Sequence, residues 1–110
     1  MIDRTHKRIV DSILGILRKH KKIIIILPAG TGRVNLANKI LYAIKDESIK
    51  SKVYRYLGDE NRYLVMNPKE TAEISVDDVK RSIELGDILI PRDIISGIKL
   101  ISEIMKIKNL

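Results

Sequence analysis

The sequence predicts one small α/β domain, residues 1–110, in which helices flank a mixed sheet. Three observations lead to this prediction. Residues 23–27 form an unbroken apolar, β-branched run, which is typical of a strand covered on both faces. Amphipathic helical spacing precedes and follows this run, and a hairpin pattern occupies residues 52–66. With 45% apolar and 32% charged residues, a chain of this length has the composition of a single globular domain.

The first predicted element is an amphipathic helix over residues 3–20. Ile9, Ile13 and Leu17 recur at helical spacing, and the opposite side of the helix is basic. Binding of phosphate groups and a purely structural role near the helix C-terminus explain these cations equally well. The basic patch consists of Arg4, Lys7, Arg8, Arg18, Lys19, Lys21 and Lys22. His6 and His20 have no partner at metal-ligand spacing and are expected to be solvated.

Residues 23–27 are expected to form the central strand. Gly30 and Gly32 allow a tight turn after it, and helical spacing resumes at Arg33. Free N–H groups at a helix N-terminus form an anion-binding geometry. A phosphate site at Gly30, Thr31, Gly32 and Arg33 and a plain strand-to-helix turn are equally good interpretations. The second helix then serves as a crossover that leads to the hairpin.

The predicted hairpin joins residues 52–57 to residues 62–66 through a turn of suitable composition. Its tyrosines, Tyr54, Tyr56 and Tyr63, alternate with basic residues, an arrangement that can stack bases and hold phosphates. Packing against the core is the better explanation for Tyr54 and Tyr56. Arg55 and Arg62 join the candidate nucleic-acid-binding residues.

Four further elements are predicted in the C-terminal half. Residues 67–70 are expected to open a short helical turn, and Ser75 to begin a helix that ends before Gly86. Residues 88–90 form a short strand. Asp93 caps a last helix over residues 94–107.

The last helix has more apolar positions than one contact face can cover. Leu100, Ile104 and Ile107 are left beside the stripe made by Ile94, Ile98, Ile101 and Met105. An exposed apolar row of this kind is commonly buried by two-fold pairing. The sequence therefore predicts a homodimer through the C-terminal helix.

Composition excludes several classes of protein. The chain has no cysteine, which rules out disulfides and thiolate metal sites. No group of residues has metal-ligand spacing, and no cofactor is predicted. The N-terminal residues lack the pattern of a signal peptide, and no apolar run is long enough to cross a bilayer, so a cytoplasmic protein is expected. Abundant Ile, Lys and Glu without Phe or Trp is typical of a thermophile or of an AT-rich genome.

Residues 9–41 resemble the start of a P-loop helicase-like ATPase domain. The similarity rests on Leu27-Pro28-Ala29-Gly30-Thr31-Gly32, which follows an apolar strand, and on Ala37 in the next helix. It implies a degenerate phosphate loop. Arg33 stands where the family has lysine, and Val34 stands where it has the Ser or Thr that ligates magnesium. The resemblance therefore implies phosphate or nucleotide binding without hydrolysis.

The order of elements is also similar to that of Alba-type archaeal chromatin proteins. These place a helix before a strand, then a Gly-Arg turn, a second helix and a basic hairpin, and Gly32-Arg33 and residues 52–66 correspond to the turn and the hairpin. This resemblance implies an archaeal DNA-binding protein.

Three functions remain open. The net charge of +7 favours a small, basic, non-enzymatic protein that binds DNA or RNA. The first alternative is the phosphate or nucleotide binder without hydrolysis. The second is a protein-protein interaction module whose C-terminal helix dimerises. No catalytic residue is predicted under any of the three.

Overall fold

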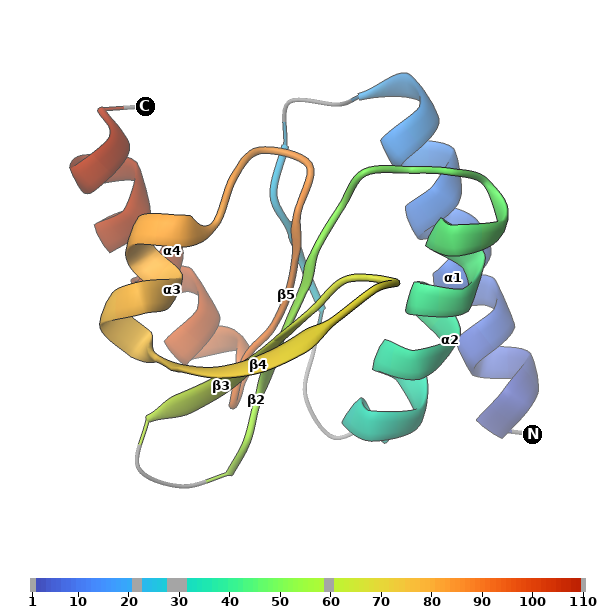
Figure 1. Cartoon of the computed structure of the whole chain (residues 1–110), viewed down its shortest axis with the longest axis horizontal. Helices are drawn as coiled ribbons and strands as arrows, with labels where there is room; N and C mark the ends of the chain where they lie inside the picture. Colours follow the sequence, from blue (N-terminus) through green and yellow to red (C-terminus); the bar gives the residue numbers. More distant parts are fainter. Residues whose placement is uncertain (1, 21–22, 28–31, 59–60, 110) are drawn as a thin grey trace.

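The computed structural model describes residues 2–20, 23–27, 32–58 and 61–109, with the backbone alone described for residues 2–5. Figure 1 shows a sheet in the middle of the molecule, with α1 and α2 on one side and α3 and α4 on the other. The elements are α1 (Ile2–Lys19), β1 (Ile25–Ile26), α2 (Arg33–Asp46), β2 (Val53–Tyr56), β3 (Arg62–Met66), β4 (Thr71–Ser75), α3 (Val76–Ser82), β5 (Ile88–Ile90) and α4 (Ile94–Lys108). The predicted α/β fold with a mixed sheet and flanking helices is confirmed.

The strand order is β1-β5-β2-β3-β4, so β5 lies between the other two parallel strands, β1 and β2. It pairs in parallel with β1 on one side and with β2 on the other. All three residues of β5 are fully buried. The prediction that residues 23–27 form the central strand is therefore wrong, because β1 lies at the edge of the sheet, where β5 is its one partner among the described strands.

The apolar run around β1 nevertheless has cover on both faces. Ile25 and Leu27 belong to the core beneath α1 and α2, whereas Ile24 and Ile26 pack against the core beneath α3 and α4. A strand buried on both faces has the same continuous apolar pattern at an edge as at the centre of a sheet.

The predicted hairpin is confirmed, with Val53 opposite Met66 and Tyr56 opposite Tyr63. Tyr54, Tyr56 and Tyr63 are buried on the face that α3 and α4 cover. Packing is thus the role of Tyr54 and Tyr56, as the sequence predicts.

The predicted helical turn at residues 67–70 is wrong. The side-chain oxygen of Asn67 accepts hydrogen bonds from the N–H groups of Lys69 and Glu70, at 2.8 and 2.9 Å, as a helix N-cap would. The chain then continues into β4, which pairs antiparallel with β3. The same local bonds therefore close a hairpin turn, since Asn side chains stabilise turns as readily as caps.

Helix α3 begins where the sequence predicts it, because the hydroxyl of Ser75 accepts the N–H of Asp78 at 3.2 Å. It ends earlier than predicted, at Ser82. Ile83 is extended and fully buried, and Gly86 lies in the turn that follows rather than at the helix end.

Helix α4 begins at its predicted cap, with the Asp93 carboxylate accepting the N–H of Ser96 at 2.7 Å. Leu100 and Ile104 are buried, so the prediction that they form part of a leftover face is wrong. The helix is rotated so that the side bearing Gly97 faces the sheet. The exposed apolar residues of α4 are Ile94, Ile95, Ile98, Met105 and Ile107.

None of the described helices combines the length and the apolar character that spanning a lipid bilayer requires.

Gly97 allows α4 to approach the parallel strands closely. A Cβ at this position would lie 2.8 Å from Cγ of Pro91 and 3.1 Å from Cγ2 of Ile26. We expect Gly97→Ala to lower the free energy of unfolding by about 1–2 kcal/mol, because the buried proline ring cannot move aside. Urea unfolding of the purified variant measures the change.

Gly15→Ala is the matched control. A Cβ at Gly15 in α1 has no heavy atom within 4 Å, and we expect alanine there to raise the free energy of unfolding by up to ~1 kcal/mol through helix propensity. Equal effects of the two substitutions would contradict the close packing inferred for α4.

Candidate phosphate-binding site

The carboxyl ends of β1, β5 and β2 meet at one end of the sheet, because these three strands are parallel. The connection after β1 leads to α2 on one face, whereas the connection after β5 leads to α4 on the other face (Figure 1). Ligands of open α/β sheets bind where adjacent parallel strands send their connections to opposite faces. The β1–β5 edge has this topology.

Arg33, the first residue of α2, reaches across this end of the sheet. Its Nη1 lies 3.4 Å from the carbonyl oxygens of both Pro91 and Arg92, which follow β5. The guanidinium carbon also lies 5.6 Å from the ring centroid of Tyr56 at the end of β2. The other guanidinium nitrogens of Arg33 make no hydrogen bond within the described residues.

Arg33 and Arg55 line the same surface hollow of about 450 Å³, which we call the arginine hollow; Gly32, Val34, Asn35, Tyr56 and Leu57 complete its lining. Partial burial, and then the positive charge of Arg33, lower the pKa of Arg55. No carboxylate of the described residues forms an ion pair with either guanidinium. Two arginines thus share a hollow without an acidic partner there.

A second cavity, of about 240 Å³, adjoins the arginine hollow through Tyr56; we call it the tyrosine pocket. Tyr56 and Tyr63 line it and pack edge to face, with their ring centroids 5.6 Å apart. Burial, followed by the neighbouring Tyr56 phenol, raises the pKa of Tyr63 to about 12. Its hydroxyl therefore stays protonated at neutral pH and can donate a hydrogen bond.

Helix α1 contributes to the same end of the molecule through His6. The prediction that His6 is solvated is wrong: it is 1% exposed, and its ring lies 3.5 Å from where a Cβ on Gly32 would stand. Nζ of Lys39 lies 3.2 Å from Nδ1 of His6. Gly32 is left-handed, with φ of +73°, a conformation that favours glycine. Lys7 and Arg8, next to His6, are exposed.

The remaining predicted residues are spread over the molecule. Arg18 forms an ion pair with Glu47 at the end of α2, and Arg62 forms one with Glu73 at 3.1 Å. His20, as predicted, and Lys19 are exposed. Lys21, Lys22, Gly30, Thr31 and the side chain of Arg4 lie outside the described residues. Of the predicted cations, the structure brings Arg33 and Arg55 into one hollow.

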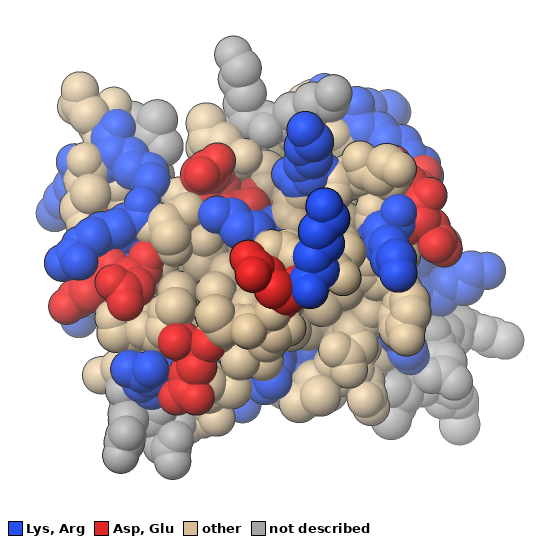
Figure 2. Space-filling view, in the orientation of Figure 1, with Lys and Arg blue, Asp and Glu red and all other residues tan. Residues whose placement is uncertain are grey.

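The charge elsewhere is mixed. On the face that Figure 2 shows, acidic side chains lie among the basic ones in both the left and the right parts of the view. A larger hollow of about 670 Å³ near the start of β2 has Lys45, Lys50 and Lys69 in its lining together with Glu70 and Glu84. The arginine hollow differs because its lining contains no carboxylate.

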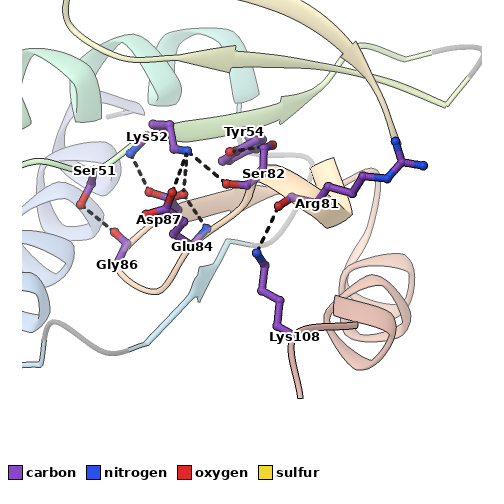
Figure 3. A network of polar contacts seen from close by, with 9 residues as sticks. All are labelled: Ser51, Lys52, Tyr54, Arg81, Ser82, Glu84, Gly86, Asp87 and Lys108. Carbon is purple, nitrogen blue, oxygen red and sulfur yellow. Dashed lines mark hydrogen bonds and ion pairs between the residues drawn. The ribbon is translucent and has the colours of Figure 1, made fainter. Parts of the chain in front are cut away.

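A polar network at the opposite end of β5 is structural (Figure 3). The buried Asp87 carboxylate accepts the N–H groups of Lys52 and Glu84, both at 2.9 Å, and Nζ of Lys52 lies 3.7 Å from it. Burial raises the pKa of Asp87 despite these bonds. The hydroxyl of Ser51 donates to the Gly86 carbonyl at 2.6 Å. These bonds hold the turn into β5 against the start of β2.

Sequence reasoning missed Arg92 and the burial of His6. A signal existed for both. His6 precedes Ile9 and Ile13 at helical spacing, on the apolar side of α1. Arg92 follows the apolar strand at residues 88–90, and Arg33 follows the apolar run at residues 23–27 after a turn. Because the carboxyl ends of parallel strands lie at one edge of a sheet, this placement predicts that the two arginines lie at the same edge.

We expect Asp87→Ala to lower the free energy of unfolding by ~2 kcal/mol or more, because two backbone N–H groups lose a charged acceptor. Thermal and urea unfolding measure this loss. Glu84→Ala is the control, since the Glu84 side chain is 75% exposed and approaches Lys52 only at 3.9 Å. If Asp87→Ala left the free energy of unfolding unchanged, the network would not stabilise the fold.

Among the described residues, no three His, Asp or Glu side chains are grouped closely enough to hold a metal ion. Comparison of the chain with protein-family models, with curated proteins and with solved structures returned no match.

Proposed function

We propose that this chain is a non-enzymatic nucleic-acid-binding protein that holds phosphate groups in the arginine hollow. The observation that carries the proposal is the pair Arg33 and Arg55, which share one open hollow with no acidic partner among the described residues. Placing two like charges together is unfavourable without an anion between them. A phosphodiester group supplies that anion, and the arginine fork matches its oxygens.

Other features at the same end support contact with a long polyanion. Lys7 and Arg8 are exposed beside His6, whose ring packs near Gly32 at the start of α2. The net charge of +7 favours association with a polyanion over a distance. The face shown in Figure 2 carries acidic as well as basic side chains, so a uniformly basic surface is not what supports the proposal. DNA and RNA both offer the required phosphates.

The second candidate function is binding of a free nucleotide or phosphate without hydrolysis. It is favoured by the N-terminus of α2, where Gly32 provides no side-chain cap and no acidic residue occupies the first turn. The side chain of Val34, a residue that is 53% exposed, has no oxygen with which to ligate a metal. Under this candidate, affinity is independent of the length of the nucleic acid, whereas under the first it rises with length.

The salt dependence of binding tests the first candidate. We expect log K for a mixed-sequence duplex to fall linearly with log salt, with a slope of about −0.9 per phosphate neutralised. The double variant Arg33→Gln, Arg55→Gln removes two phosphate contacts and should make the slope shallower by about 1–2. Fluorescence anisotropy of a labelled oligonucleotide measures both slopes.

Arg62→Gln is the matched control, because Arg62 already pairs with Glu73 on the neighbouring strand. It should leave the slope unchanged. Binding that does not depend on salt would reject the proposed contact. An equally shallow slope for Arg62→Gln would reject it as well.

We further propose that a second copy of the chain covers the exposed apolar side of α4. Ile94, Ile98 and Met105 follow one side of the helix, and they are 47%, 57% and 45% exposed. Ile95 is 77% exposed beside them. Two-fold pairing would place the same residues of both copies in contact and would give two phosphate sites to one particle.

Sedimentation equilibrium tests this pairing. We expect Ile98→Glu to convert a dimer to a monomer, because it places a charge in the centre of the apolar contact. Tyr42→Glu is the control, since Tyr42 is 73% exposed on α2, on the other face of the sheet. A wild-type chain that sediments as a monomer up to the highest soluble concentration would refute the dimer.

A further inference from the structure

The tyrosine pocket contains polar groups that the fold leaves without partners. Tyr56 and Tyr63 are 9% and 4% exposed, and neither hydroxyl makes a hydrogen bond within the described residues. Buried hydroxyls are nearly always hydrogen-bonded in folded proteins. Tyr54 shows the usual arrangement, since its hydroxyl lies 3.1 Å from Oγ of Ser82. The two unpartnered phenols are therefore available to a ligand in the pocket.

The rest of the pocket lining has the character of a site for a planar heterocycle. Leu100 and Val76 provide apolar surface, and the Asn61 amide adds a donor and an acceptor. Lys80 and Glu103, which also line the pocket, form an ion pair with each other. Arg92 and Lys99 add positive charge to the lining, and Arg92 lies 3.7 Å from the Asp93 carboxylate. The volume of about 240 Å³ is below the 300–1,000 Å³ typical of drug-sized ligands, and it fits a single ring system.

Tyr56 connects this pocket to the arginine hollow, because it lines both cavities and its ring centroid lies 5.6 Å from the guanidinium carbon of Arg33. We propose that the two cavities form one nucleotide site, in which Arg33 and Arg55 hold the phosphate and the tyrosine pocket takes an unstacked base. This inference rests on the proposed function and adds that the bound nucleic acid is single-stranded at the site. A base can enter the pocket only from a single strand, because the bases of a duplex are paired and stacked.

The test compares three DNA probes at one low salt concentration: a short single strand of mixed sequence, an abasic strand of equal length, and the corresponding duplex. The wild-type chain should bind the single strand about tenfold or more tightly than the abasic strand, because a bound base adds stacking and hydrogen bonds. Tyr63→Phe keeps the ring and removes the hydroxyl. It should weaken binding of the single strand about two- to tenfold and leave binding of the abasic strand unchanged.

Two other variants make the result specific. Asn61→Gly removes the amide and tolerates the left-handed backbone of this position, where φ is +52°, so it should weaken single-strand binding to a similar degree. Tyr42→Phe makes the same change as Tyr63→Phe on an exposed tyrosine of α2 and should have no effect. Unfolding midpoints confirm that each variant is folded.

The outcomes separate this inference from the proposed function. If single and abasic strands bind equally at low salt, phosphate binding stands and the base pocket is refuted. If Tyr63→Phe weakens binding of both strands equally, the pocket is also refuted. If no probe binds at low salt, the proposed function fails, and the nucleotide site fails with it.

Discussion

The insertion of β5 between β1 and β2 is the constraint on which the rest of this structure depends. Three residues, Ile88–Ile90, form the one described strand that pairs with β1, and they connect it to the antiparallel half of the sheet. Both faces of β5 are buried, and the two hydrophobic cores meet across it. A strand this short is held at its ends. The Asp87 carboxylate fixes its amino end, and the carbonyls of Pro91 and Arg92 accept hydrogen bonds from Arg33 at its carboxyl end.

The same insertion creates the candidate site. Since β5 is parallel to both neighbours, its carboxyl end lies beside the ends of β1 and β2, and residues distant in sequence meet there. Arg33 comes from the helix after β1, Arg55 from β2 and Arg92 from the turn after β5. The guanidinium of Arg33 contacts both the β5 end and Tyr56 on β2. The pairing of the parallel strands therefore brings these three arginines to the same end of the sheet.

Local patterns in the sequence were sufficient for the fold class and for most element positions. Ser75 and Asp93 mark helix starts because capping is a bond between neighbours in the chain. Asn67 shows the limit of this logic, since its side chain makes the bonds of a cap but closes a turn between strands. The order of strands was beyond local patterns. An apolar run records that a strand is covered, and it does not record which strand lies beside it.

The site was predictable only in part for the same reason. Arg33 and Arg55 were each candidates by residue type, but their shared hollow follows from the pairing of β2 with β5. Arg62, equally basic in the sequence, is neutralised by Glu73 across the β3–β4 pair. The rotation of α4, which buries Leu100 and Ile104, depends on the close contact at Gly97.

The pairing of β1 with β5 also sets the order in which the chain can fold. The β2–β3–β4 meander joins neighbours in sequence and can form early, because closing short loops costs little entropy. Ile25 pairs with Ile88, so β1 has no partner in the sheet until the segment after α3 is available. Long-range parallel pairing of this kind slows folding. During synthesis, β1 therefore emerges well before β5 and cannot pair in the sheet until β5 has followed it.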